Sequence, residues 1–143
     1  LFQDHFVAVV RPGHPLCVGT LTAARYAAAR HILVSRRGLE QGPIDEALAH
    51  LGLVRTAATL VPGFATALAL VRGSDLVATV PERHCAALHA DLVTLPLPFP
   101  LAGIRVALIW HPSQDADPAH RWLRTLIRET CAQAPYGGDT RDS

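Results

Sequence analysis

The sequence predicts an α/β fold with a largely parallel sheet from the alternation of strand and helix patterns, and its composition and length fit one domain with a buried core. Half of the 143 residues are hydrophobic and 17% are charged, which is enough apolar material for a buried core. Short β-rich runs alternate with segments of helical pattern between residues 32 and 97. The length fits one ordinary domain and argues against two independent ones.

The first half of the chain contains five predicted elements. Residues 5–10 are a β-rich run that an Arg-Pro-Gly turn ends, and a threonine then caps a helix that continues to about residue 30. Residues 31–34 are an apolar run of strand length. Residues 43–51 form a helix with proline in its first turn and glycine after its last turn. Residues 53–61 form the next strand.

The second half begins with a helix at residues 62–72, which Pro-Gly opens and glycine closes. A strand at residues 75–80, a short helix at residues 82–89 and a strand at residues 91–97 follow. After a proline-rich connector, the elements at the end of the chain are a strand at residues 103–110 and an amphipathic helix at residues 118–128.

The flanks of the chain have a different organisation from its middle. Residues 1–30 and 99–128 each offer one strand and one helix, which together make a thin core. We therefore expect the flanks to belong to a lobe separate from that of the middle of the chain, and the remainder of this separate lobe to lie upstream. There is no methionine, even at position 1, so Leu1 is not expected to be a natural start.

Charge and cysteine content exclude several classes of partner. Thirteen arginines and twelve acidic residues give a net charge of +1, so no general attraction to nucleic acid or anionic lipid is expected. Cys17, Cys85 and Cys131 are odd in number and far apart, which favours a reducing cytoplasm. The longest apolar run, residues 57–71, is too short to span a bilayer, so no membrane contact is predicted.

Motifs for catalysis and metal binding are weak. The eight histidines lack the close spacing of metal ligands, and there is no Cys-x-x-Cys. Ser35 follows a strand but lacks the glycines of a nucleophile elbow. His84 beside Cys85 does not by itself place an imidazole against a thiolate. The chain is therefore predicted to be no enzyme and to bind no metal or cofactor.

Ligand binding is better supported, because ligands of open α/β sheets bind beyond the carboxyl ends of the strands. Three such ends are residues 35–38, 62–64 and 79–81. The N–H groups of Gly63 and Phe64, the Ser35 hydroxyl and Arg36 could hold a carboxylate, and Phe64 could stack on an aromatic body. In the alternative interpretation, Phe64 belongs to the core, Ser35 caps a turn and Arg36 is solvated.

The order of several motifs resembles the effector-binding domain of LysR-type transcriptional regulators. These motifs are FVAVVRPGHPL (residues 6–16), HILVS (31–35), VPGF (61–64), ALALV (67–71) and GSDLVATVP (73–81). WHP (110–112) and DPAHRWLR (117–124) look like the branch related to nodulation and nitrophenol-type regulators. The resemblance covers about residues 2–128, and it is the order and spacing that make it specific.

The resemblance implies a two-lobed fold like type 2 periplasmic binding proteins, with the first lobe only partly present. Residues 1–30 would end the first lobe, residues 31–96 would form the second lobe, residues 97–130 would return to the first, and residues 131–143 would be a tail. The hinges would lie at residues 29–31 and 95–100.

The resemblance also implies a function. A small inducer, aromatic or carboxylate-bearing, would bind between the lobes, and DNA would be bound through a helix-turn-helix domain absent from this chain. The protein would be a cytoplasmic homodimer or homotetramer. The helix of residues 44–51 and the strand of residues 53–60 would supply the second-lobe half of the dimer surface. The alternatives are a periplasmic solute-binding protein of the same architecture and a small α/β enzyme.

The resemblance also implies a set of ligand-binding residues, at positions where family members line the cleft between the two lobes. These residues are Ser35, Arg36, Pro62, Gly63, Phe64 and Thr79.

Overall fold

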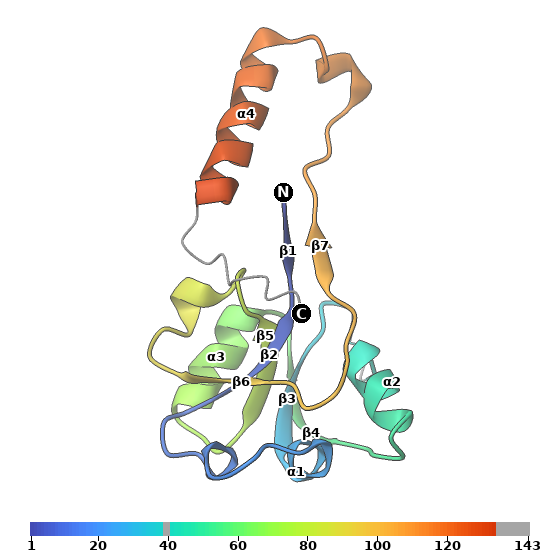
Figure 1. Ribbon diagram of the computed structural model, residues 1–143, viewed down its shortest axis with the longest axis vertical. Coiled ribbons are helices and arrows are strands. Elements are labelled where there is room, and N and C mark those ends of the chain that lie inside the picture. Colours follow the sequence, from blue (N-terminus) through green and yellow to red (C-terminus); the bar gives the residue numbers. More distant parts are fainter. Residues whose placement is uncertain (39–40, 134–143) are drawn as a thin grey trace, which may run out of the picture. The chain divides into compact units, whose positions relative to one another are not determined.

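The computed structural model describes residues 1–38 and 41–133, and the chain divides into two compact units. One unit is residues 5–103, and the other joins residues 1–4 to the segment from Ile104 onward. Both contain strands and helices, so the predicted α/β class is confirmed (Figure 1). Within the described residues, no helix is both long enough and apolar enough to cross a membrane.

A five-stranded sheet in the order β4-β3-β5-β2-β6 forms the centre of the unit of residues 5–103. Its strands are β2 (Phe6–Val10), β3 (Arg30–Val34), β4 (Thr56–Val61), β5 (Val77–Pro81) and β6 (Val93–Pro96). β3 pairs in parallel with β4 and β5, whereas β2 pairs antiparallel with both β5 and β6. The sheet is therefore mixed rather than parallel throughout, because β2 inserts between two strands that run the opposite way.

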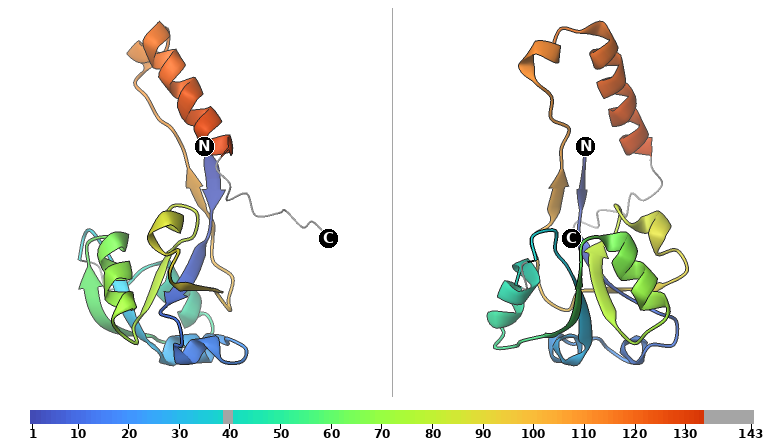
Figure 2. Two further views of the ribbon diagram at one scale, coloured as in Figure 1. Left: turned by 90° about the vertical axis from the view of Figure 1, so that its left-hand side faces the viewer. Right: turned by 180° about the vertical axis from the view of Figure 1, so that it is seen from behind.

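Alternating side chains of the strands build a core on each face of this sheet. Val7 and Val9 of β2 pack on the face that α3 (Phe64–Arg72) covers. Ala8 and Val10 point to the opposite face and pack with α1 (Ala23–Ala28) and α2 (Pro43–Ala49). The period of two along the strand thus produces a helix–sheet–helix sandwich (Figures 1 and 2).

Capping residues account for where the helices of this unit begin and end. Thr22 accepts a hydrogen bond from the Arg25 N–H (3.2 Å) at the start of α1. Pro43 occupies the first turn of α2, where a missing N–H costs nothing. The turn after α2 contains Gly52 at φ 69°, a left-handed conformation that favours glycine.

The second unit is smaller. β1 (Phe2–Asp4) pairs antiparallel with β7 (Ile104–Val106), and Phe2 lies opposite Val106. α4 (Pro118–Gln133) follows a short 3₁₀ turn, η3 (Pro112–Gln114). Trp122, Leu123 and Leu126 of α4 are 66%, 44% and 43% exposed, so much of its apolar surface is uncovered in this chain.

Some predicted elements differ from the structure. The helix expected at residues 82–89 is a turn followed by a 3₁₀ helix, η2 (Ala86–Leu88), in which the Leu88 N–H donates to the carbonyl three residues earlier, that of Cys85, at 2.8 Å. The strand expected at residues 103–110 is limited to β7, and β1 was not predicted. Residues 131–133, expected in the tail, extend α4, and the remaining tail residues, 134–143, lie outside the described residues.

The bounds of the two compact units do not coincide with those of the expected lobes, which stay a prediction. Residues 5–30 and 97–103 belong to the unit with the five-stranded sheet, since β2 pairs with β5 and β6. The chain passes between the units after Asp4 and after Gly103, and the expected hinges at residues 29–31 and 95–100 lie inside one unit. Sequence pattern predicts that a strand exists but not which strands it will pair with.

Candidate functional site

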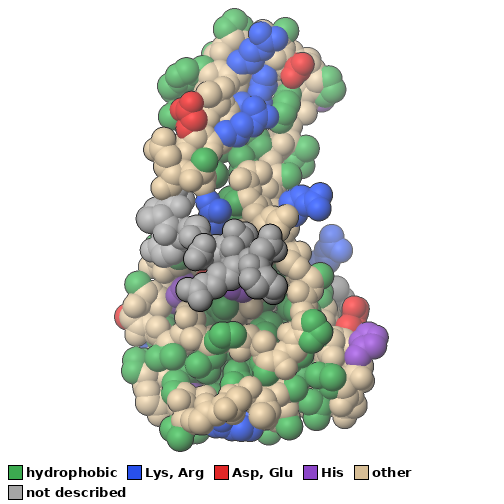
Figure 3. Space-filling view, in the orientation of Figure 1, with side chains coloured by type: hydrophobic (Ala, Val, Ile, Leu, Met, Phe, Trp, Pro, Cys, Tyr) green, Lys and Arg blue, Asp and Glu red, His purple; other side chains and the backbone are tan. Residues whose placement is uncertain are grey.

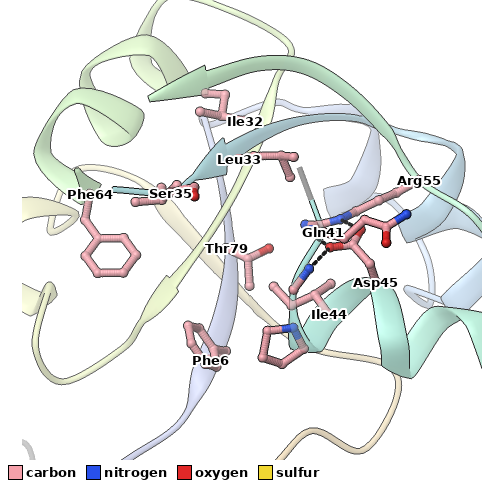
Figure 4. A pocket seen from close by; sticks show the side chains of 13 residues that line it. Phe6, Ile32, Leu33, Ser35, Gln41, Ile44, Asp45, Arg55, Phe64 and Thr79 are labelled. Atoms are coloured by element: carbon pink, nitrogen blue, oxygen red, sulfur yellow. Dashed lines mark hydrogen bonds and ion pairs between the residues drawn. The ribbon is translucent and has the colours of Figure 1, made fainter. Parts of the chain in front are cut away.

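A cavity of about 270 Å³ lies at the carboxyl end of β3, within the unit of residues 5–103 (Figure 4). It is lined by residues 32–35, the first turn of α2, Phe6, Phe64 and Thr79. Parallel β3 and β5 end at the same edge of the sheet, and antiparallel β2 begins there. The cavity thus occupies the place where open α/β sheets bind ligands.

Three of the six predicted ligand-binding residues line this cavity, namely Ser35, Phe64 and Thr79. The other three, Arg36, Pro62 and Gly63, are not among its lining residues. Arg36 and Pro62 are exposed, and Gly63 is the N-cap of α3. The arginine predicted to hold a carboxylate therefore lies outside this cavity.

The lining residue Thr79 contacts a buried polar side chain, Tyr26, which does not itself line the cavity. The Thr79 hydroxyl lies 2.7 Å from the hydroxyl of Tyr26, and Tyr26 is fully buried. Burial raises the pKa of Tyr26, so its hydroxyl keeps its proton. His31, also fully buried, places Nε2 at 2.8 Å from the Tyr26 carbonyl oxygen, and burial lowers its pKa to about 4. The imidazole is therefore neutral near pH 7.

One wall of the cavity contains an ion pair between Asp45 of α2 and Arg55. Arg55 donates from Nε to Asp45 Oδ1 at 2.7 Å and from Nη2 to Asp45 Oδ2 at 2.8 Å, a bidentate geometry. The Gly42 N–H donates to Asp45 Oδ2 at 2.9 Å, which caps α2. The two side chains are only 7% and 22% exposed for Arg55 and Asp45, respectively.

The pair holds both groups in their charged forms. Burial would raise the pKa of the Asp45 carboxyl, but the hydrogen bonds and the charge of Arg55 hold it below its usual range. Burial would likewise lower the pKa of the Arg55 guanidinium, and the hydrogen bonds and charge of Asp45 contribute to holding it above its usual value. The wall is therefore ionised but has no net charge.

A second, larger cavity of about 480 Å³ lies between α2 and the segment that leads into β4. Leu48 and Ala49 of α2, together with Leu53, Val54 and Ala57, form the apolar part of its lining. Asp45 and Arg55 line both cavities. The ion pair is thus a wall that the two cavities share.

Sequence reasoning missed Asp45, Arg55, Ile44 and Phe6 as lining residues. One available signal was the Gly-Pro-x-Asp pattern at residues 42–45, because an aspartate at the third helical position can cap the helix N-terminus. That pattern places the start of α2 but does not reveal that Arg55, ten positions later, returns to Asp45.

Metal and nucleophile chemistry have little support in the described part of the chain. There, no group of three or more His, Cys, Asp or Glu side chains could hold a metal ion. Cys85 is buried in the core under α3, and the ring of His84 packs edge-on against Phe64 with centroids 6.4 Å apart. Phe64 thus also contributes to packing, as the alternative interpretation expected.

The second unit has its own polar centre. The guanidinium of Arg124 lies 4.5 Å from the centre of the Trp110 ring and donates to the carbonyls of Gln114 and Asp115, each at 3.0 Å. Arg128 also approaches this ring, at 5.7 Å. Figure 3 shows arginine side chains gathered on the face of this unit. These contacts hold the turn before α4 against the helix.

Comparison with protein families gives one match over nearly the whole chain. Residues 1–132 match the family described as LysR substrate binding domain. The HTH-type transcriptional regulator SyrM of Rhizobium meliloti is 36% identical over 137 residues, which are 94% of this chain and 42% of SyrM. The chain spans less than half the length of the curated relatives it matches.

Solved structures agree with this match. The regulatory domain of MexT, a transcriptional activator in Pseudomonas aeruginosa, is 34% identical with a TM-score of 0.76 over 90% of this chain and 64% of that one. The effector binding domain of QuiR, solved in complex with shikimate, is 19% identical with a TM-score of 0.58. That alignment covers 87% of this chain and 64% of the QuiR chain. At this identity, the similarity between the two chains shows a shared fold alone.

Proposed function

The chain belongs to the LysR substrate-binding domain family, and from this membership we propose that it is the effector-sensing part of a DNA-binding transcriptional regulator. The expected resemblance and the periplasmic-binding-protein-like fold are confirmed by the family match and the solved regulatory domains. The relatives compared are transcriptional regulators, which favours this function over a periplasmic solute-binding protein.

The observation that carries the proposal is the cavity at the carboxyl end of β3. It combines the Phe6 and Phe64 rings with the hydroxyls of Ser35 and Thr79, a lining typical of sites for small organic molecules. A volume of about 270 Å³ suits a ligand of one ring. The binding of shikimate by QuiR is a precedent for a small organic effector on this fold.

We further propose that the unit of residues 5–103 is the second lobe and that residues 1–4 and 104–133 belong to the first. Binding of the effector at the cavity would then favour one lobe arrangement of the whole regulator. Ser35, Phe64 and Thr79 would contact it directly. Arg36, Pro62 and Gly63, which do not line the cavity, stay predicted ligand-binding residues.

The partners in this proposal are an effector, DNA and further copies of the same protein. A helix-turn-helix domain outside this chain would bind DNA, in a cytoplasmic protein without catalytic activity or cofactor. The face of α2 and β4 would form half of a dimer surface, with Leu51, Val54 and Leu60 exposed by 51%, 87% and 37%. The ion pair shared by the two cavities would connect effector binding to this surface.

The proposal is tested with Phe64→Ala in the intact regulator and a reporter gene under its operator. Removing the ring should raise the inducer concentration needed for half-maximal response by about tenfold, the loss expected for one well-packed aromatic contact. Operator binding, measured by gel shift, should stay unchanged. Leu70→Ala is the matched control, because Leu70 is on the same helix but is 41% exposed and outside the cavity.

An unchanged dose response for Phe64→Ala would remove the cavity from the effector site. Equal losses in both variants would indicate a general effect of weakening α3.

A further inference from the structure

The charged side chains that line the cavity determine which ligands it can bind. Of the lining residues that the structure describes, Arg55 is the only one with a positive charge, and Asp45 is the only one with a negative charge. The remaining lining side chains are aromatic, aliphatic, hydroxyl or amide. Any selection by ligand charge on this side of the site therefore depends on the Asp45–Arg55 pair.

Arg55 is already committed to its partner. Two of its nitrogens donate to the two oxygens of Asp45, at 2.7 and 2.8 Å, in the geometry that a ligand carboxylate would otherwise adopt. The Arg55 side chain is 7% exposed, so little of the guanidinium remains available for a second anion. Asp45 thus occupies the position of an anionic ligand.

Asp45 is itself held firmly in place. Its Oδ2 also accepts the Gly42 N–H at 2.9 Å, and Pro43 and Ile44 fix the first turn of α2 beside it. An incoming carboxylate would have to displace a carboxylate that the chain holds at three points. It would also leave Asp45 partly buried beside it without a counter-charge, which is unfavourable.

The rest of the cavity suits an uncharged ring. Figure 4 shows Phe64 on one side and the Asp45–Arg55 pair on the other, with Thr79 between them. The Thr79 hydroxyl already pairs with Tyr26 and can accept a further hydrogen bond from a ligand, because a hydroxyl oxygen has two lone pairs. The aromatic edges and these dipoles favour a neutral ring with a hydroxyl or amide group.

We propose that this cavity selects an uncharged aromatic ligand over its carboxylate counterpart, and that Asp45 sets this selection by neutralising Arg55. The proposal rests on the proposed function, because it assumes that the cavity binds the effector. It narrows the expected ligand class from aromatic or carboxylate-bearing molecules to neutral aromatic ones on this side of the site. Asp45 is then the residue that determines ligand charge.

Benzamide and benzoate are suitable probes, since they have nearly the same shape and differ in charge. The 143-residue chain, labelled with ¹⁵N, would be titrated with each probe at millimolar concentration while the backbone amides of Ser35, Gly42 and Thr79 are followed by NMR. We expect benzamide to bind at least about tenfold more tightly than benzoate, the ratio that one charge-assisted hydrogen bond is worth.

The variant Asp45→Asn tests the role of the carboxylate. It keeps the shape and one capping oxygen while leaving Arg55 with an uncompensated charge, so benzoate should gain about tenfold in affinity and benzamide should change little. Asp91→Asn is the matched control. Asp91 pairs bidentately with Arg72, with both contacts at 2.7 Å, and this pair does not line the cavity.

Each outcome decides a different point. Benzoate binding as well as or better than benzamide in the unmodified chain overturns charge selection and leaves the cavity as an effector site. A folded Asp45→Asn chain with an unchanged probe ratio removes Asp45 as its cause. If neither probe moves the cavity amides, the cavity is no ligand site and the proposed function fails with it. The comparison in the unmodified chain remains decisive even if Asp45→Asn does not fold.

Discussion

Two arginine–aspartate pairs in the unit of residues 5–103 have nearly the same geometry and very different surroundings. Arg55–Asp45 and Arg72–Asp91 are both bidentate, with contacts of 2.7 to 2.8 Å. The first pair has side chains 7% and 22% exposed, whereas the second has 41% and 60%. Since water competes for and screens an exposed pair, only the first should contribute strongly to stability or to ligand choice.

The largest expected effect comes from breaking the less exposed pair. Arg55→Met leaves the Asp45 carboxylate partly buried without a counter-charge, and we expect the free energy of unfolding to fall by about 3 to 4 kcal/mol. Arg72→Met, the same change in the exposed pair, should have a much smaller effect. Urea denaturation of both variants at pH 7 measures the difference, and similar losses would show that exposure does not separate the pairs.

The next effect concerns a buried histidine. The pKa of His31 is about 4 in the folded chain against 6.5 unfolded, so the unfolded chain binds the proton more tightly. The contribution of neutral His31 to the free energy of unfolding is therefore fully present above pH 6.5. It is lost as the pH falls toward 4, by about 3 kcal/mol in total at about 1.4 kcal/mol per pH unit.

Unfolding free energies measured from pH 7 to 4 test this expectation. His31→Leu should flatten that part of the curve, whatever it does to stability at pH 7. His50→Gln, a substitution at an exposed histidine, is the surface control. A slope that survives in His31→Leu would assign the acid sensitivity to other groups.

The smallest expected effect is the loss of one buried hydrogen bond. Tyr26→Phe removes the hydroxyl that lies 2.7 Å from the Thr79 hydroxyl, and should cost about 1 kcal/mol. Ser74→Ala removes an exposed hydroxyl that donates to the Leu70 carbonyl at 2.7 Å, and should cost less. Thermal unfolding followed by circular dichroism compares the two, and an equal or larger loss in Ser74→Ala would contradict the comparison.

Local sequence signals predicted much of the fold. Hydrophobic periodicity and the flanking glycines placed α3 and β5 within a few residues, because those signals act over short distances. The reversed strand β2 and the passages between the units could not be found this way. They depend on which strands pair, and β2 pairs with partners that are far away in the sequence.

The candidate site, like the fold, was predicted from the sequence only in part. Ser35 and Phe64 were predicted to bind ligand from the rule that ligands lie at strand ends, Thr79 was predicted from the family resemblance, and all three line the cavity. Whether they contact a ligand stays a prediction. The Asp45–Arg55 wall went unnoticed, because a charge pair ten residues apart looks the same in sequence whether it is buried or exposed. Burial is a property of the assembled sheet and helices.

The way the chain leaves and re-enters the smaller unit has a consequence for the order of folding. Leu1 donates to the Val106 carbonyl, 105 residues away, and β1 pairs with β7 beside it. Closing so long a flexible loop early would cost entropy that two three-residue strands cannot repay. The residues between them form their own sheet and both hydrophobic cores, so they can fold first and turn the loop into a folded insert. We therefore expect β1 and β7 to pair after the residues between them have folded, in a step of high contact order.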